Sequence, residues 1–360
     1  MLLVIWAFGS APVVADTLKL AYFNTELSRK GPGLLLRDIL KGDAQTRAVA
    51  QVIAHVAPDV IVLGGVDFDH QNVALAALRD EVAKAGHSLP YMFSCRPNAG
   101  MATGLDLDGD GRLGEGEDAQ GFGHFAGDGG LAVLSRYRLA EEDLRDFTPL
   151  LWRDLPGAML PTDPAKPDRL FPSEAVYDVQ RLSSTAHWIL PVEIPGGRLD
   201  LMIWKAGPPV FDGPEDRNGR RNHDENRFWS LLLEGAFGPV PQDFVLLGGA
   251  NLDPVDGDGR HEAILSLLAD PRLQDPKPAG HGGVRDPAHR GNPALDTVDW
   301  PEDGPGNLRV DYVLPSATLN VVGAGVFWPA PDSNLHDLAA TASRHRLVWV
   351  ELDLGQRLGQ

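Results

Sequence analysis

Cysteine, basic residues and long apolar runs are scarce in this chain. Cys95 is the single cysteine among 360 residues, so neither an intrachain disulfide nor a thiolate metal cluster can form. The 32 Lys and Arg residues against 50 Asp and Glu residues give a formal net charge of −18, a field that repels polyanions. After residue 15, no segment approaches the roughly 20 apolar residues needed to span a bilayer. The composition therefore argues against a disulfide scaffold, non-specific nucleic-acid binding and a membrane span in the mature protein.

The N-terminus is an apolar stretch, MLLVIWAFGSAPVVADT. Its length, and the small residues Val13 and Ala15 before Asp16, predict a signal peptide over residues 1–15 and a periplasmic or secreted protein. Two features oppose this: the stretch has no Lys or Arg, and it is compatible with a buried first strand running into LKLAYF. The hydrophobic content of 43% is ample for a packed core, and we expect residues 16–360 to form a single domain.

Short apolar runs of β type alternate with helical patterns along the rest of the chain. The expected strands are Leu18–Phe23, Val60–Leu63, Leu131–Leu134, Leu199–Trp204, Phe244–Leu247, Val310–Leu314 and Leu347–Leu352. The expected helices are Ala44–Val56, Asn72–Ala85, Glu225–Glu234 and Glu262–Leu267. This alternation predicts an α/β protein with a central sheet and outer helices.

Two stretches rich in Gly, Pro and Asp, Pro97–Gly130 and Gly280–Gly306, are expected to be long loops that elaborate one domain. His187 and Trp188 lie beside an apolar run and are most simply core or cleft-wall residues. The charged run GPEDRNGRRNHDENR, residues 213–227, is compatible with a substrate loop over a cleft, but its opposite charges nearly balance. A salt-bridged surface loop is therefore at least as well supported.

Six segments carry a resemblance to a known family. In chain order they are AYFNTE, DVIVLGGVDFD, LMIWKAGPPVFDGPEDRNGRRNHDE, FVLLGGANLDP, LRVDYVLPS and SRHRLVWVEL. Their order and chemistry resemble the endonuclease/exonuclease/phosphatase superfamily, with the DNase I-like fold, over about Leu18 to Leu354. The third segment and the LDLDGDGR loop resemble a bacterial exported subgroup. The resemblance implies a four-layer sandwich in which two packed, mostly antiparallel β-sheets are flanked by helices.

The resemblance also implies a chemistry, the hydrolysis of phosphate esters. In this family a divalent metal held by carboxylates polarises the phosphoryl group, while Asp, His and Asn side chains act on water and phosphate oxygens. Four catalytic positions of the family pattern are retained here: Asn24, Asn251, Asp311 and His345.

Other catalytic positions depart from the family pattern. Gly65 stands where a metal-binding Glu is expected and Gly249 where a catalytic Asp is expected. Lys205 lies near the position of a His, and Arg344 replaces an Asp. Because hard cations need oxygen ligands, these changes leave little reason for catalytic Mg²⁺ or Mn²⁺. Lys205 and Arg344 predict instead a metal-free pocket for a small phosphate-like anion.

Four alternatives remain open at this stage. The changed site is compatible with simple drift and no ligand, or with an unidentified protein partner. Residual hydrolysis is compatible with Asp311 and His345 acting as an acid–base pair. An active metal site is conceivable if Glu26, Asp67 or Asp253 replaces the missing ligands. Strand alternation places Asp67 on the face of Gly65, displaced by about 6 to 7 Å along the strand.

The segment DLDGDGRLGEGE matches the spacing of a calcium-binding loop. Asp106, Asp108 and Asp110 occupy positions one, three and five, the Arg112 carbonyl position seven, and Glu117 position twelve. The flanks are too rich in Gly and Pro for the helices of an EF-hand, so the sequence predicts a lone structural Ca²⁺ loop. The alternative is an acidic surface turn. A second acidic turn, DPVDGDGR at residues 253–260, is less regular and a weaker metal candidate.

Overall fold

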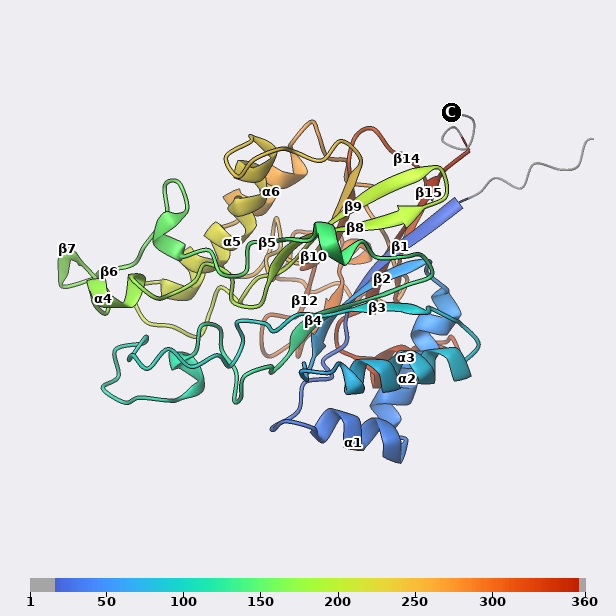
Figure 1. The fold of residues 1–360 in the computed structure, drawn as a ribbon, viewed down its shortest axis with the longest axis horizontal. Coiled ribbons are helices and arrows are strands. Elements are labelled where there is room, and N and C mark those ends of the chain that lie inside the picture. The colour runs from blue at the N-terminus through green and yellow to red at the C-terminus, as the bar shows by residue number, and fades with distance from the viewer. Residues whose placement is uncertain (1–16, 356–360) are drawn as a thin grey trace, which may run out of the picture.

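The computed structural model describes residues 17–355, which form two large β-sheets packed face to face (Figure 1). The first sheet has the strand order β14-β15-β1-β2-β4-β3 and the second β13-β10-β9-β8-β5, with two small two-stranded sheets, β11-β12 and β6-β7. The strands are β1 Thr17–Asn24, β2 Val60–Val66, β3 Tyr91–Phe93, β4 Gly130–Ser135, β5 Arg145–Asp146, β6 Thr162–Asp163, β7 Lys166–Leu170, β8 His187–Ile194, β9 Gly197–Lys205, β10 Phe244–Gly249, β11 Val298–Asp299, β12 Asn307–Leu308, β13 Asp311–Pro315, β14 Asn320–Phe327 and β15 Leu347–Asp353. The α-helices are α1 Leu34–Lys41, α2 Ala44–Val56, α3 Val73–Lys84, α4 Glu174–Tyr177, α5 Arg217–Leu233, α6 Glu262–Leu268 and α7 His336–Ala342. The predicted signal peptide, residues 1–15, lies outside the described residues.

The layers follow from side-chain alternation along strands that are buried on both faces. In β1, the side chains of Leu18, Leu20 and Tyr22 enter the core between the sheets, whereas Ala21 and Phe23 pack against α1 to α3. The second sheet likewise packs its outer face on α5 and α6, on the opposite side of the molecule (Figure 1). The predicted sandwich of two sheets flanked by helices is confirmed, and His187 and Trp188 lie in its core.

Helix α5 is where the fold differs most from the expectation. We predicted its start at Glu225 and a loop before it, but the helix begins at Arg217, and 12 of its 17 residues are buried. The surface-loop interpretation of residues 213–227 was wrong, because the polar side chains find partners inside the protein. Asn222, for example, donates to the carbonyl oxygens of Gly207 (2.7 Å) and Ala250 (2.8 Å).

The strand β14 was not predicted, because its sequence NVVGAGVF lacks the usual β pattern. It pairs with β15 at the edge of the first sheet. A Cβ atom at position 325 would lie 2.9 Å from the Trp349 ring, so a glycine lets the strand pass over this large side chain. The edge pairing, rather than local propensity, holds β14 in place.

The parallel pairs β1–β2 and β9–β10 end at the same side of the sandwich. In register, Asn24 lies opposite Gly64, and Gly249 lies between Lys205 and Asp311. Because β1 packs on β10 and β13, these strand ends from the two sheets meet at one edge. Residues far apart in sequence are thus brought together there.

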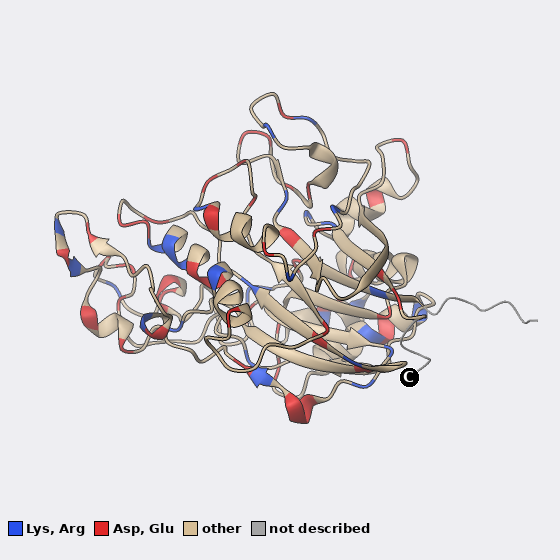
Figure 2. Cartoon of the chain, turned by 90° about the horizontal axis from the view of Figure 1, so that it is seen from above, with Lys and Arg blue, Asp and Glu red and all other residues tan. Residues whose placement is uncertain are grey.

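Acidic and basic segments are interspersed along the loops and helices of this molecule (Figure 2). Within residues 17–355, no helix is both long and apolar enough to cross a bilayer.

Candidate functional site

Three retained side chains form a hydrogen-bonded chain at the edge where the strands end. Asp311 Oδ2 lies 2.6 Å from His345 Nδ1, and His345 Nε2 lies 3.1 Å from Asn24 Nδ2. All three residues are buried, with exposed fractions of 1%, 4% and 6% respectively. Asn24 Nδ2 can only donate, so Nε2 accepts, and the proton of a neutral His345 sits on Nδ1 toward Asp311. This is the arrangement of an oriented acid–base pair.

The position of the missing Glu has no room for a larger side chain. Gly65 has φ 68°, in the left-handed region that disfavours residues with a Cβ atom. A Cβ atom there would lie 2.8 Å from Asn24 Oδ1 and 3.0 Å from the Glu26 backbone nitrogen. The backbone of this strand end has therefore adapted to glycine, and a carboxylate cannot be placed there without a shift of Asn24.

The position of the missing Asp is closed by a tyrosine. Added Cβ atoms would lie 2.8 Å from Tyr22 Oη at position 249 and 2.5 Å from it at position 64. The hydroxyl of Tyr22 thus fills space between the ends of β2 and β10. Both Tyr22 Oη and Asp311 Oδ1 are buried without a hydrogen-bond partner among the described residues. Burial, followed by the charge of Asp311, raises the pKa of Tyr22 well above its usual value.

Arg344, predicted to bind an anion, is paired with Glu26. Its Nε and Nη2 atoms donate to Glu26 Oε1 at 2.9 and 2.5 Å, and its backbone nitrogen donates to Oε2 at 2.8 Å. Burial is the largest single effect on Glu26 and opposes its ionisation, but the hydrogen bonds from Arg344 and the charges of His345 and Arg344 together outweigh it, and the pKa of the carboxyl lies below its usual value. The pairing engages both the guanidinium and the carboxylate, and their opposite charges compensate each other.

Lys205 lines a pocket of about 730 Å³ beside this pair. The pocket lies between the ends of β1, β2 and β9, the loop of residues 97–130 and the start of α5. Burial lowers the pKa of Lys205, while Asp311, Glu225, Glu26 and Asp128 act in the opposite direction through their charges. Within residues 17–355, no hydrogen bond or ion pair engages the Lys205 ammonium group, so its donors face the pocket unpaired.

Most other charged groups of the pocket are engaged by the protein. Arg221 donates to the Leu182 carbonyl oxygen at 2.9 Å, among others, and Arg217 to that of Leu107 at 2.5 Å. The carboxylate of Glu225 accepts from Ser184 and Gly207, and that of Asp128 accepts from Ser28 and His124. Glu117 also lines the pocket, and no described residue pairs with it. Sequence reasoning missed Tyr22 and Asp128. Arg221 and Glu225 belong to the charged run of residues 213–227, for which a substrate loop over a cleft was one of the two interpretations, and both line the pocket.

Asn251 lies outside the pocket lining. Its side-chain nitrogen donates to the Ala206 carbonyl oxygen at 2.6 Å, and its φ of 48° marks a tight turn after β10. Among the expected site residues, the structure therefore joins Asn24, Asp311 and His345 but gives Asn251 a backbone partner.

The proposed substitute metal ligands are engaged elsewhere. Asp67 accepts from the backbone nitrogens of Arg29 (3.0 Å) and Gly129 (3.1 Å), and burial raises its pKa to about 6. Asp253 accepts from the backbone nitrogen of Arg309 at 2.7 Å. Neither residue lines the pocket, and Glu26 is bound to Arg344.

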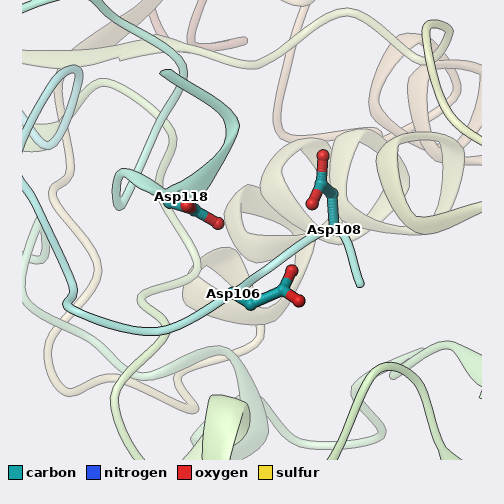
Figure 3. Close-up of side chains that lie close together, drawn as sticks. All are labelled: Asp106, Asp108 and Asp118. Atoms are coloured by element: carbon teal, nitrogen blue, oxygen red, sulfur yellow. The ribbon is translucent and has the colours of Figure 1, made fainter. Parts of the chain in front are cut away.

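The acidic loop brings together a different set of carboxylates from the predicted one. Oxygen atoms of Asp106, Asp108 and Asp118 lie within 4.8 Å of one another (Figure 3). Asp110 and Glu117 are not part of this cluster; Glu117 points to the pocket instead. Among residues 17–355, no second group of three or more His, Cys, Asp or Glu side chains has such an arrangement. The carboxylates that line the pocket, those of Glu26, Glu117, Asp128 and Glu225, therefore form no such group.

Comparisons with known proteins agree with this architecture. The sequence pattern of the Endonuclease/Exonuclease/phosphatase family matches residues 21–345. No curated protein matches the chain.

Among solved structures, an endonuclease/exonuclease/phosphatase from Beutenbergia cavernae DSM 12333 is 18% identical, with a TM-score of 0.54 over 94% of this chain and 72% of that one. A family protein from Leptotrichia buccalis C-1013-b is 15% identical, with a TM-score of 0.50 over 93% and 99% of the two chains. Sphingomyelinase C from Streptomyces griseocarneus is 17% identical, with a TM-score of 0.49 over 93% and 99%. The match over residues 21–345 establishes that this chain belongs to the endonuclease/exonuclease/phosphatase family.

Proposed function

We propose that this family member binds a small phosphate-like anion at Lys205 and does not hydrolyse phosphate esters through the metal-dependent route. The observation that carries the proposal is the unpaired ammonium group of Lys205 in a pocket lined by Gly65, where the family pattern has a metal-binding Glu. Gly249, where the pattern has a catalytic Asp, lies opposite Lys205 on the neighbouring strand. The N-terminal sequence, residues 1–15, supports a periplasmic or secreted location for this activity.

An anion would supply the partner that Lys205 lacks. A partly buried ammonium group without a hydrogen-bond acceptor is costly, and a phosphate oxygen offers a charge-assisted hydrogen bond. Four carboxylates contribute to the field at Lys205, and Glu117 adds an unpaired negative charge to the lining. We therefore expect weak binding that depends on this one lysine.

Titration calorimetry of the full chain with inorganic phosphate tests the binding proposal. Lys205→Met should abolish the heat, whereas Lys166→Met, on an exposed site of β7, should not change it. Glu117→Gln should tighten binding because it removes a like charge from the lining. Unchanged binding in Lys205→Met, or no binding by the parent chain, would reject the proposal.

A second candidate is hydrolysis by a rearranged site, favoured by the intact chain of Asp311, His345 and Asn24. Phosphomonoester and phosphodiester assays across Mg²⁺, Mn²⁺ and Ca²⁺ decide between the two functions. Activity of the parent chain above an Asp311→Ala/His345→Ala control would favour hydrolysis, and equal rates would favour the binding function.

The acidic loop is proposed to hold a structural Ca²⁺ ion. The carboxylates of Asp106, Asp108 and Asp118 supply hard oxygen donors, which suit this cation. Export would help, since extracellular modules work at calcium dissociation constants of about 10⁻⁴ to 10⁻³ M.

A further inference from the structure

We infer that the ligand is an organic phosphate or phosphonate whose charged group meets Lys205 and whose apolar group contacts Phe122 and Phe211. This inference rests on the proposed function and specifies the class of ligand. Its basis is an aromatic rim on the same pocket that contains the unpaired lysine.

Two large apolar side chains of the pocket are turned toward solvent. Phe122 has an exposed fraction of 60% and Phe211 one of 87%, and both line the pocket. Alanine and proline residues, among them Ala119 and Pro208, add apolar surface to the same lining. Aromatic rings exposed at the rim of a concave site, rather than scattered singly, mark a place where an apolar group is bound.

The backbone at Phe211 is held in an unfavourable conformation. Its φ is 72°, an outlier for a bulky residue, and such strain persists only where the surroundings impose it. Asn218, in the first turn of α5, imposes it: its side chain donates to the Val210 carbonyl oxygen at 2.8 Å, and its backbone nitrogen donates to Asp212 Oδ2 at 2.5 Å. Both neighbours of Phe211 are thereby fixed, and the ring is presented outward instead of entering the core.

Phe122 lies on the loop of residues 97–130, away from Phe211 in sequence. Its ring meets that of His124 edge-on, with centroids 5.5 Å apart. A Cβ atom at position 116 would lie 3.0 Å from the ring, so Gly116 gives Phe122 a close backbone surface to pack on. The loop therefore positions this ring rather than leaving it free.

The size of the pocket supports a ligand larger than inorganic phosphate. A volume of about 730 Å³ lies in the range of about 300 to 1,000 Å³ typical of small-molecule sites. A phosphate ion at Lys205 would leave most of this space and both phenylalanine rings unused. An attached aryl or short alkyl group would cover the rings while the anion stays at the lysine.

A matched ligand pair tests the inference: phenylphosphonate and methylphosphonate carry the same anionic group and differ in apolar surface. Covering roughly 60 Å² of that surface is worth about tenfold in affinity, so phenylphosphonate should bind the full chain about tenfold more tightly. Phe211→Ala and Phe122→Ala should each remove much of that advantage and leave methylphosphonate binding unchanged. Leu40→Ala, an exposed apolar residue of α1, is the control and should change neither affinity.

The outcomes separate this inference from the function on which it rests. Equal affinities for the two phosphonates, both lost in Lys205→Met, would overturn the aromatic rim and leave anion binding standing. Binding of either phosphonate that survives Lys205→Met would overturn both. Adhesion to neutral phosphatidylcholine vesicles that depends on Phe211, without the phenylphosphonate preference, would show that the rings meet a lipid surface and would also overturn the inference.

Discussion

At the scale of single residues, the changed site is a coordinated arrangement. Gly64 and Gly249 leave space for the Tyr22 hydroxyl, and Gly65 has a backbone conformation suited to glycine. Arg344 has a partner of its own in Glu26. We therefore expect that restoring one carboxylate alone does not restore the family site, because the neighbouring side chains now occupy its surroundings.

Gly249→Asp should consequently destabilise the protein. Its Cβ would lie 2.8 Å from Tyr22 Oη, and the new carboxylate would join Asp311 in a buried place. Overpacking together with an unpaired buried charge predicts a loss of roughly 2 to 4 kcal/mol in the free energy of unfolding. Urea denaturation measures this loss, and Gly31→Asp, where the nearest side-chain atom is 3.6 Å from the added Cβ, is the matched control.

A double-mutant cycle identifies the cause. If the Tyr22 hydroxyl is the obstacle, Gly249→Asp should cost less in a Tyr22→Ala background than in the parent chain. Equal costs in the two backgrounds would show that the tyrosine does not close the position.

At the scale of elements, the sequence predicted the strands that consist of apolar runs. It missed the part of a helix that is held by hydrogen bonds of buried polar side chains. The strand Leu199–Trp204 was found within β9 because, from Leu201 to Trp204, both its faces are buried and its residues are apolar. The first two turns of α5 were missed because buried Arg, Asn and Asp side chains look like a surface sequence. Their partners are backbone carbonyls of distant loops, which no local pattern specifies.

The same contacts predict that Arg221 is a structural anchor of α5. Its guanidinium donates to the carbonyl oxygens of Leu182, Gln120, Arg181 and Ser183. Arg221→Met should leave these buried acceptors unpaired and cost roughly 3 kcal/mol in the free energy of unfolding.

Arg220→Met is the control for this change, because Arg220 is the adjacent, partly exposed residue. Its one ion pair among the described residues is long, with Nε 4.0 Å from Asp216 Oδ2. Urea denaturation should show a loss below about 1 kcal/mol for this variant. Similar losses for the two variants would contradict the anchoring role of Arg221.

The acidic loop provides a prediction about metal binding. Ca²⁺ should raise the melting temperature of the parent chain, because an ion bound to the folded state alone stabilises it. Asp108→Ala and Asp118→Ala should abolish the shift, and Glu117→Gln, outside the carboxylate cluster, should retain it. A shift that disappears in Glu117→Gln but persists in Asp118→Ala would favour the ligand set read from loop spacing over the one observed in the structure.

At the scale of the whole molecule, the sandwich of two sheets was predictable from the sequence. The arrangement of the side chains at the edge where the strands end was predictable only in part. Six ordered segments were enough for the two sheets, and three of the four retained catalytic positions do meet there. The pairing of Arg344 with Glu26 and the aromatic rim were not predictable, since both join segments more than 80 residues apart. The strained backbone at Phe211 is held by Asn218 of the same segment, and the sequence pattern gave no indication of it.

At this scale the pH dependence of folding provides a prediction, in which the contribution of Asp296 to the stability of the fold falls as the pH rises. Burial, followed by the charges of Asp253 and Asp256, raises the pKa of its carboxyl from 3.8 to about 8. Between these pH values the folded state binds more protons than the unfolded state, so this contribution is complete below about pH 4 and lost as the pH rises through about 8. Asp296→Asn, which removes the charge, should therefore be more stable than the parent chain at pH 9, by roughly 2 kcal/mol or more, and gain little at pH 4. Urea denaturation across this range measures the difference, with Asp332→Asn as the exposed control. If the free energies of unfolding of the parent chain and of Asp296→Asn change in parallel with pH, the raised pKa of the Asp296 carboxyl is contradicted.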